Sequence, residues 1–453
     1  MCMIRPLATR KTAFLQPQLL KTSRKIGFAR SAASEKSFSR KYPTETADPE
    51  KLIVKIIIVG NGLAGTMAAK TLRELDKQVE IEIFAEEPYI YYPRPNLIEF
   101  VAGNLPYERM FAFPASWYNQ QQIQLRLGTP IKSIVPDSQE VEIGNGQRLT
   151  YDLLLLANGA SAFLPPIKGA DKRGVFTLRT LNDALSILEY IKSHSRLVVI
   201  GGGLLGLEIA RAAKARGADV EVVEVFPYLL PRQLDPQGAA LLRTEIEKCG
   251  IRVRLNVATD EILGSDEIRG LRFKNGEELS ADMAIVAAGV RANVDIVKQA
   301  GLAVDRGVVV NEFLETGKPC IYAAGDGIQH NGRLYGIIPA SFEQARLVAA
   351  SMLGQRKKYE GTIPSNTLKV VGLYVTSIGL VSPEGGGFEE IRRENREEGM
   401  YKKIVLQNGI LVGAVWMGTK NGVNGISRAL TQKLNVERWK QSLLDDQFDF
   451  SLL

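Results

Sequence analysis

Three glycines, Gly60, Gly62 and Gly65, have the spacing of a phosphate-binding turn. The apolar run 52–59 before them predicts a buried strand, and residues 66–77 after them predict a helix. The first glycine would allow a tight turn, the second would let a diphosphate approach the backbone, and the third would let the helix pack closely on its strand. The helix N-terminus would then direct free N–H groups at the anion. The whole motif reads Val59, Gly60, Asn61, Gly62, Leu63, Ala64 and Gly65.

The same pattern occurs a second time. Its parts are a predicted strand at 197–200, the glycines Gly201, Gly203 and Gly206, and a predicted helix at 207–216. Each copy also has a closing apolar strand, at 151–159 in the first copy and 282–289 in the second, and these strands end at Asn158, Gly159 and Gly289. Two complete copies are much stronger evidence for dinucleotide binding than a single motif. The sequence therefore predicts an α/β fold with two Rossmann-like units that bind two dinucleotides.

Acidic residues follow the second strand of each copy. Glu86 and Glu87 follow the predicted strand 79–84, and Glu224 follows the predicted strand 219–223. A carboxylate at this position accepts hydrogen bonds from an adenosine 2′-OH and repels a 2′-phosphate. No Arg follows Glu224 to receive such a phosphate, so NADH is favoured over NADPH. Glu86 and Glu87 can also be read as solvated turn residues.

Two further segments have residues suited to a dinucleotide site. In the segment 88–104, rich in Tyr and Pro, Arg94 offers a fork of donors for a diphosphate or a flavin carbonyl, although a packed surface loop explains the segment equally well. Asp326 ends an apolar strand, where ligands of open α/β sheets bind; the alternative is a helix-capping role. The helix predicted from Ile338 would point its N-terminal dipole at a reduced ring system.

The remaining patterns predict the domain organisation. Residues 123–149 predict a small antiparallel meander, and residues 361–453 predict a separate α+β domain closed by a helix at 423–433. The charged run 389–398 is read as a solvated loop or helix face, with a partner-docking patch as the alternative. The predicted division is an extension at 1–50, first-motif domain parts at 51–163 and 291–360, a second-motif domain at 164–290 inserted between them, and the domain at 361–453.

Composition excludes several other classes of protein. Of the net charge of +7 over 453 residues, +6 comes from residues 1–50, so the nearly neutral remainder does not favour nucleic-acid binding. No apolar run is long enough to span a membrane. The three cysteines are far apart and only two histidines are present, which argues against a disulfide framework or a metal site. Residues 1–50 are read as a transit peptide or as an upstream extension, so the expected location is cytoplasmic with mitochondrial as the alternative.

The chain after residue 52 resembles the flavoprotein pyridine-nucleotide oxidoreductases, which have two dinucleotide-binding domains. Within that superfamily, the segments 91–97, 330–336, 368–370 and 401–406 most resemble NADH:rubredoxin oxidoreductases and the flavin portion of NAD(P)H nitrite reductases. The resemblance implies that FAD binds the first glycine motif and NAD(P)H binds the second.

The resemblance also implies roles for individual residues. Those implied for FAD are Gly60, Gly62 and Gly65 at the diphosphate, Glu86 or Glu87 at the ribose, Arg94, Asn158 and Gly159 beside the cofactor, and Asp326 at the ribityl chain. Those implied for NADH are Gly201, Gly203, Gly206 and Glu224, with Gly289 closing the site. Glu208, expected near the nicotinamide, and Glu343 are the catalytic candidates. Asn158 departs from the family, which usually has Thr there.

Missing cysteines narrow the expected reaction. Disulfide-reducing and peroxide-reducing members have cysteines in the segment after the first ribose acid, and this chain has tyrosines there instead. We therefore expect electrons to pass from NADH through FAD to a separate carrier such as rubredoxin, with a homodimer as a compatible assembly. The alternatives are an NADH oxidase, the flavin component of a nitrite-reducing system, or a flavin-binding redox sensor of the apoptosis-inducing-factor kind.

Overall fold

The computed structural model describes residues 53–191, 196–370 and 373–453. The predicted extension at 1–50, with its two interpretations, lies outside these ranges. No helix in the described part of the chain has both the length and the apolar content that crossing a membrane would require.

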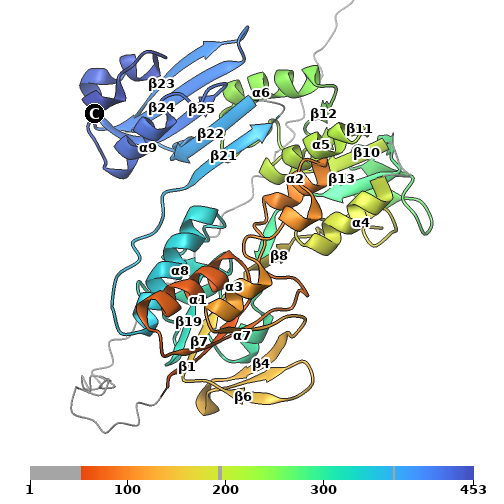
Figure 1. The fold of residues 1–453 in the computed structure, drawn as a ribbon. Helices are drawn as coiled ribbons and strands as arrows, with labels where there is room; N and C mark the ends of the chain where they lie inside the picture. The colour runs from red at the N-terminus through yellow and green to blue at the C-terminus, as the bar shows by residue number, and fades with distance from the viewer. Residues whose placement is uncertain (1–52, 192–195, 371–372) are drawn as a thin grey trace, which may run out of the picture. The chain divides into compact units, whose positions relative to one another are not determined.

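The first glycine motif lies in a five-stranded parallel sheet with the strand order β19-β7-β1-β2-β3. The strands are β1 (Lys55–Val59), β2 (Glu80–Phe84), β3 (Ile123–Arg126), β7 (Leu153–Leu156) and β19 (Ile321–Ala323). Helices α1 (Leu63–Leu75) and α8 (Ile338–Met352) pack against each other beside this sheet (Figure 1). Helix α1 begins at Leu63, three residues before the predicted start, because Gly65 is part of its first turn.

The second motif lies in a parallel sheet with the strand order β12-β11-β10-β16-β9. Its strands are β9 (Val175–Phe176), β10 (Arg196–Ile200), β11 (Asp219–Val223), β12 (Arg252–Arg254) and β16 (Met283–Val286), and its helices are α4 (Leu181–Ile191), α5 (Leu204–Ala215) and α6 (Pro236–Lys248). In both sheets the strand before the glycine turn lies between the closing strand and the strand that precedes the acids. The predicted α/β class with an inserted second unit is confirmed, because β9 to β16 lie between β7 and β19 in the chain. The domain boundaries stay a prediction.

The prediction of a single meander at 123–149 is wrong in part. Strand β3 pairs in parallel with β2 as an edge of the first sheet, and only β4 (Ile131–Val135), β5 (Glu140–Ile143) and β6 (Arg148–Thr150) form an antiparallel meander. Alternation of apolar residues predicts a strand but does not say whether its partner runs parallel. The other small elements are β13 (Thr259–Leu263), β14 (Gly270–Phe273), β15 (Glu278–Ser280), β8 (Ala160–Ala162), β17 (Val290–Ala292), β18 (Val308–Val310), β20 (Ile328–His330), α3 (Ala115–Gln120) and α7 (Asp295–Gln299).

The C-terminal residues form an antiparallel sheet with the order β21-β22-β25-β24-β23 and the helix α9 (Val423–Thr431). Its strands are β21 (Ser365–Val370), β22 (Leu373–Gly379), β23 (Phe388–Asn395), β24 (Met400–Gln407) and β25 (Ile410–Met417). The charged run at 389–398 was predicted to be a loop or helix face, and that prediction is wrong. Most of the run lies in edge strand β23, where Ile391 is buried and charged side chains suit an exposed edge.

The segment predicted as a loop at 88–104 contains a helix, α2 (Asn96–Ala102), so that prediction is also wrong. Its apolar side chains Leu97, Ile98 and Val101 are buried, and it ends at Gly103, whose φ is +84°. The preceding prolines and tyrosines obscured this short pattern. These apolar side chains join the hydrophobic core of the second sheet, although the segment precedes that sheet by about 80 residues in the chain.

A buried carboxylate connects α6 to the C-terminal sheet. Asp235 caps α6 by accepting a hydrogen bond from Gly238 N at 3.0 Å. Its oxygens also accept from Tyr401 Oη at 2.7 Å, Arg392 Nε at 3.0 Å and Lys403 Nζ at 3.1 Å. Burial alone would raise the pKa of Asp235, but these hydrogen bonds outweigh burial and lower the pKa to about 2.

We expect Asp235→Asn to lower the free energy of unfolding at pH 7 by about 2 kcal/mol. The folded pKa lies below the unfolded value of about 3.9, so the carboxylate stabilises the fold above that pH and loses its contribution as the pH falls towards 2. The difference between variant and parent should therefore narrow below about pH 4. Chemical denaturation at several pH values measures it, and a difference independent of pH contradicts the assignment. Tyr401→Phe, which keeps the charge, is the matched control.

Candidate functional site

The first glycine turn is shaped by close backbone contacts. Gly60 has a φ of +109°, and a Cβ on it would lie 2.3 Å from Ala157 O. A Cβ on Gly65 would lie 2.0 Å from Gly60 O. A Cβ on Gly62, in contrast, would meet nothing within 4 Å. Gly60 and Gly65 are therefore required by the fold, while Gly62 borders open space.

The second turn repeats these contacts almost atom for atom. Gly201 has a φ of +119°, and its Cβ would lie 2.6 Å from Ala287 O. A Cβ on Gly206 would lie 1.9 Å from Gly201 O, and one on Gly203 would meet nothing within 4 Å. The chain thus builds the same cradle twice.

Both cradles fit a diphosphate group. The N-cap residues of α1 and α5 are Gly62 and Gly203, both extended and without a side-chain cap. The first N–H groups of each helix are therefore not used by a capping side chain, and the space beside each glycine is open. In the first turn Asn61 Nδ2 is also a buried donor without a partner among the described residues. Free donors and a positive helix end are what an anion needs at this position.

The acidic residues that follow β2 and β11 differ in their hydrogen-bond partners. Glu224 is 6% exposed and accepts hydrogen bonds from Gly202 N at 2.5 Å and from Phe226 N at 3.0 Å, so it lies against the second glycine turn. In the first unit Glu87 is paired with Arg94, whereas Glu86 is exposed and has no side-chain partner among the described residues. Of the two acids the sequence left open, Glu86 has the freer carboxylate for a ribose.

Arg94 was predicted to face the cofactor, and its donors are occupied by protein groups. Arg94 Nη2 donates to Glu87 Oε1 at 2.6 Å and Arg94 Nη1 donates to Arg179 O at 2.7 Å. The side chain of Arg179 continues the network, because it pairs with Asp326 at 2.8 Å and donates to Ala160 O at 2.9 Å. Arg179 was missed by sequence reasoning, since nothing marks a single Arg before a helix as a link between Arg94 and Asp326.

A pair of asparagines joins the end of closing strand β7 to the segment that follows β17. Asn158 Nδ2 donates to Asn293 O at 2.9 Å, and Asn293 Nδ2 donates to Asn158 O at 2.8 Å. Gly159 and Gly289 follow the closing strands with φ of +62° and +99°, and a Cβ on either would meet nothing within 4 Å. The side-chain amide of Asn158 donates one of these bonds and its backbone carbonyl accepts the other, so together they join the end of β7 to the segment after β17.

Helix α8 holds the turn that contains Asp326. Gln344 Oε1 accepts from Gly325 N at 2.8 Å, and Gln344 Nε2 donates to Tyr359 Oη at 3.0 Å. Ser341 Oγ lies 3.4 Å from Asp326 Oδ1. Gln344 was not singled out from the sequence, because an amide inside a helix has no motif of its own.

The two catalytic candidates lie in different surroundings. Burial raises the pKa of Glu208 to about 7; Arg211 opposes that shift and Glu99 adds to it. Glu343 is exposed on α8, where it accepts a hydrogen bond from Thr362 Oγ1 at 2.6 Å. A carboxyl that titrates near neutral pH is a functional candidate, so Glu208 is the stronger of the two.

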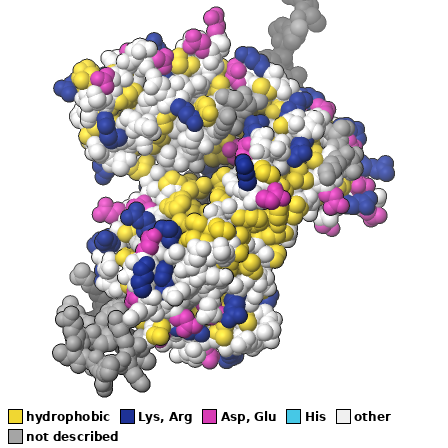
Figure 2. Space-filling view, viewed as in Figure 1, with side chains coloured by type: hydrophobic (Ala, Val, Ile, Leu, Met, Phe, Trp, Pro, Cys, Tyr) yellow, Lys and Arg dark blue, Asp and Glu magenta, His cyan; other side chains and the backbone are white. Residues whose placement is uncertain are grey.

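An apolar area accompanies these polar groups on the surface. Figure 2 shows a broad field of apolar side chains in the middle of the face it draws, with both signs of charge around it. Among the described residues, Ile338 and Phe342 at the start of α8 are 47% and 44% exposed, and Leu164 is 43% exposed. Ile338 and Phe342 are one helical turn apart, close in sequence to Ser341.

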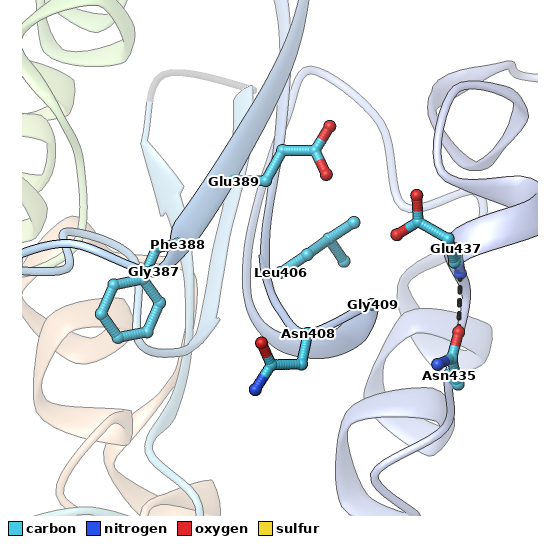
Figure 3. Close-up of a pocket in the computed structure, with 8 residues that line it drawn as sticks. All are labelled: Gly387, Phe388, Glu389, Leu406, Asn408, Gly409, Asn435 and Glu437. Carbon is cyan, nitrogen blue, oxygen red and sulfur yellow. Dashed lines mark hydrogen bonds between the residues drawn. The ribbon is translucent and has the colours of Figure 1, made fainter.

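A separate surface cavity lies in the C-terminal sheet, away from the predicted site residues. It has a volume of about 490 Å³ and is lined by Gly387, Phe388, Glu389, Leu406, Asn408, Gly409, Asn435 and Glu437 (Figure 3). The Glu389 and Glu437 carboxylates both pair with Lys440. None of the predicted site residues lines this cavity.

Comparison with known proteins matches two family models. Residues 54–345 match the pyridine nucleotide-disulphide oxidoreductase family, and residues 364–434 match the rubredoxin NAD+ reductase C-terminal domain. The chain is 36% identical over 400 residues to a nitrite reductase [NAD(P)H] of Bacillus subtilis, covering 86% of this chain and 49% of that protein. The chain spans about half or less of the length of the nitrite reductase relatives and of the assimilatory nitrate reductase electron transfer subunit.

A shorter relative is matched over nearly its whole length. The chain is 30% identical to an NADH-rubredoxin oxidoreductase of Clostridium acetobutylicum, covering 81% of this chain and 93% of that protein. Among solved structures, a covalent putidaredoxin reductase–putidaredoxin complex matches with a TM-score of 0.80 and 27% identity, covering 88% of this chain and 97% of that chain.

The glycine contacts predict that Gly65→Ala mainly lowers stability, whereas Gly62→Ala mainly lowers cofactor binding. We expect Gly65→Ala to lower the free energy of unfolding by about 3 kcal/mol or more, because its Cβ would collide with Gly60 O. Gly62→Ala should change it by no more than about 1 kcal/mol, yet the purified protein should retain little bound flavin, because the Cβ enters the space where the diphosphate would lie. Thermal unfolding and flavin absorbance measure the two effects. A Gly62→Ala protein with its full flavin content contradicts the assignment, and Gly203→Ala with Gly206→Ala is the matched pair for nicotinamide nucleotide binding.

Proposed function

This chain belongs to the pyridine nucleotide-disulphide oxidoreductase family, and we propose that it passes reducing equivalents from NADH through FAD to a separate small electron carrier. The observation that carries this proposal is the pair of matching cradles, each open only beside its middle glycine. Two such cradles on two sheets provide for two dinucleotides, as the transfer of hydride between two coenzymes requires.

The residues around the first cradle would hold FAD. Gly62 and the N-terminus of α1 would bind its diphosphate, and Glu86 would accept hydrogen bonds from its ribose. Asp326, kept in place by Arg179 and Ser341, would face the ribityl chain. When bound, FAD supplies the acceptance of hydride and the release of electrons, and the protein supplies alignment and electrostatics.

The residues around the second cradle would hold NADH. Gly203 and the N-terminus of α5 would bind the diphosphate, and Glu224 would bind the adenosine ribose. Glu208 lies in the first half of α5 and would lie near the nicotinamide, with its proton exchangeable near neutral pH. The Asn158–Asn293 pair would fix the closing strands on which the two rings meet.

The acceptor is proposed to be an external one-electron carrier, because the segment in which disulfide-reducing relatives have their cysteines has none in this chain. The segment between β2 and α3 contains no cysteine, and the two free cysteines of the described residues are Cys249, which is exposed, and Cys320, which precedes β19. The C-terminal match is named for rubredoxin NAD+ reductase, and the 93% coverage of the NADH-rubredoxin oxidoreductase favours a carrier of that kind. A small iron–sulfur protein is therefore the proposed partner.

Anaerobic mixing with NADH tests the proposed function. We expect rapid loss of the flavin absorbance near roughly 450 nm, with recovery only when oxidised rubredoxin or a related carrier is added. Rapid recovery with oxygen alone would instead favour an NADH oxidase, a function named for a relative 32% identical to this chain. Slow bleaching with a persistent charge-transfer band would indicate a redox sensor and contradict the proposal.

Glu224 should determine the choice of nucleotide. We expect Glu224→Gln to weaken NADH binding on the order of tenfold and to narrow the preference over NADPH, because the carboxylate that repels a 2′-phosphate is lost. Steady-state kcat/KM for both nucleotides measures the change. Glu221→Gln is the control, since Glu221 lies on β11 just before Glu224 but pairs with Arg252 and Arg254. An unchanged ratio for Glu224→Gln would refute the role.

A further inference from the structure

Helix α2 precedes the second unit in the chain but packs in the core of that unit. Helices α2 and α5 lie side by side (Figure 1). The buried side chains Leu97 and Val101 of α2 belong to the same hydrophobic cluster as Leu207 and Ala210 of α5. Helix α5 starts at the second glycine turn, and α2 starts two residues after Arg94. The contact between α2 and α5 therefore connects the neighbourhood of the proposed FAD site with the helix proposed to bind NADH.

Polar groups fix this contact at two points. Arg211 Nη2 of α5 pairs with Glu99 Oε1 of α2 at 2.5 Å, and Glu99 Oε2 accepts from Asn104 Nδ2 at 2.7 Å. Arg216 Nε donates to Val101 O at 2.8 Å. The Arg211 side chain is 20% exposed and that of Glu99 is 45% exposed, so the pair is buried on the side of α5 and open to solvent on the side of α2.

Arg211 also lies one helical turn after Glu208. Residues three apart on a helix face the same side, so Arg211 shares a face of α5 with Glu208 while its guanidinium pairs with Glu99. Arg211 Nε is buried and has no hydrogen-bond partner among the described residues. A buried donor without an acceptor is costly, and a carboxylate on the same face of the helix would offset that cost.

We propose that Arg211 is a positioning residue, which holds α5 against α2 through Glu99 and sets the charge state of the Glu208 carboxyl beside the nicotinamide site. The inference rests on the proposed function for the identity of that site, but not for the contacts themselves. Glu99 and Arg211 would act as one unit: the loss of either frees the other and leaves Glu208 with a different electrostatic environment.

The charged side chains of the neighbouring strands β10 and β11 form ion pairs of their own. On β10 and β11 these are Arg196 paired with Asp282, Asp219 paired with Arg252, and Glu221 paired with Arg252 and Arg254. Besides burial, two charges shift the pKa of Glu208: Arg211, which favours its ionised form, and Glu99, which disfavours it.

Opposite shifts in titration provide the test. In the holoenzyme with ¹³C-labelled glutamate carboxyls, Glu208→Gln identifies the Glu208 signal. We expect Arg211→Gln to raise the pKa of Glu208 and Glu99→Gln to lower it, each on the order of one unit, while Arg211→Lys restores most of the parent value. A role confined to packing would move both variants in the same direction or leave the pKa unchanged, and either result overturns the proposal.

Nucleotide binding tests the coupling independently. Calorimetry should show that Glu99→Gln and Arg211→Gln each weaken NAD⁺ binding on the order of threefold to tenfold and that the double variant is no weaker than the worse single variant. Additive losses would overturn the shared role. If NADH fails to bleach the flavin while the titration shifts persist, the proposed function fails and the Arg211 inference stands. If NADH bleaches the flavin but the titration shifts are absent, the Arg211 inference fails and the proposed function stands.

Discussion

The close approach of a helix to the strand before it is the constraint on which both units depend. The Gly65 and Gly206 Cα atoms lie against carbonyl oxygens of their own glycine turns, where any Cβ would lie about 2 Å from backbone. This approach places the first turns of α1 and α5 at the carboxyl ends of parallel strands, with their N–H groups directed at open space. The anion sites follow from packing, because a looser helix would move those donors away from a common point.

A different interaction connects the two units. It involves a helix whose position in the chain and position in the fold belong to different units. Helix α2 belongs by sequence to the first unit and by packing to the second. Arg94 and Arg179 extend the connection through polar groups that end at Asp326. Side chains that the family resemblance assigns to the cofactor thus also bind one another, and this fixes the site before a ligand enters it.

The sequence was sufficient to predict both glycine turns, their strands and helices, and the inserted arrangement, because these features depend on local spacing. It was insufficient wherever a partner lay far along the chain. Strand β3 was placed in a meander because alternation does not reveal a parallel neighbour, and α2 was hidden by the prolines and tyrosines before it. Arg179, Gln344 and the Asp235 network could not be inferred, since each role exists only through contacts between distant segments. The assignments of the site residues themselves stay predictions.

The two glycine turns differ at two positions: the first has Asn61 and Ala64 where the second has Gly202 and Leu205. In the second turn Gly202 donates to Glu224, and a Cβ there would lie 2.5 Å from Leu229 Cδ2, so only glycine brings the carboxylate onto the turn. In the first turn the same position is Asn61, whose Oδ1 accepts from Thr66 and Tyr118. The first turn thus bonds to side chains at the position where the second turn bonds to Glu224 through its backbone. Glu86, which is exposed, stays our proposed ribose acid of the first unit, since Glu87 is held by Arg94.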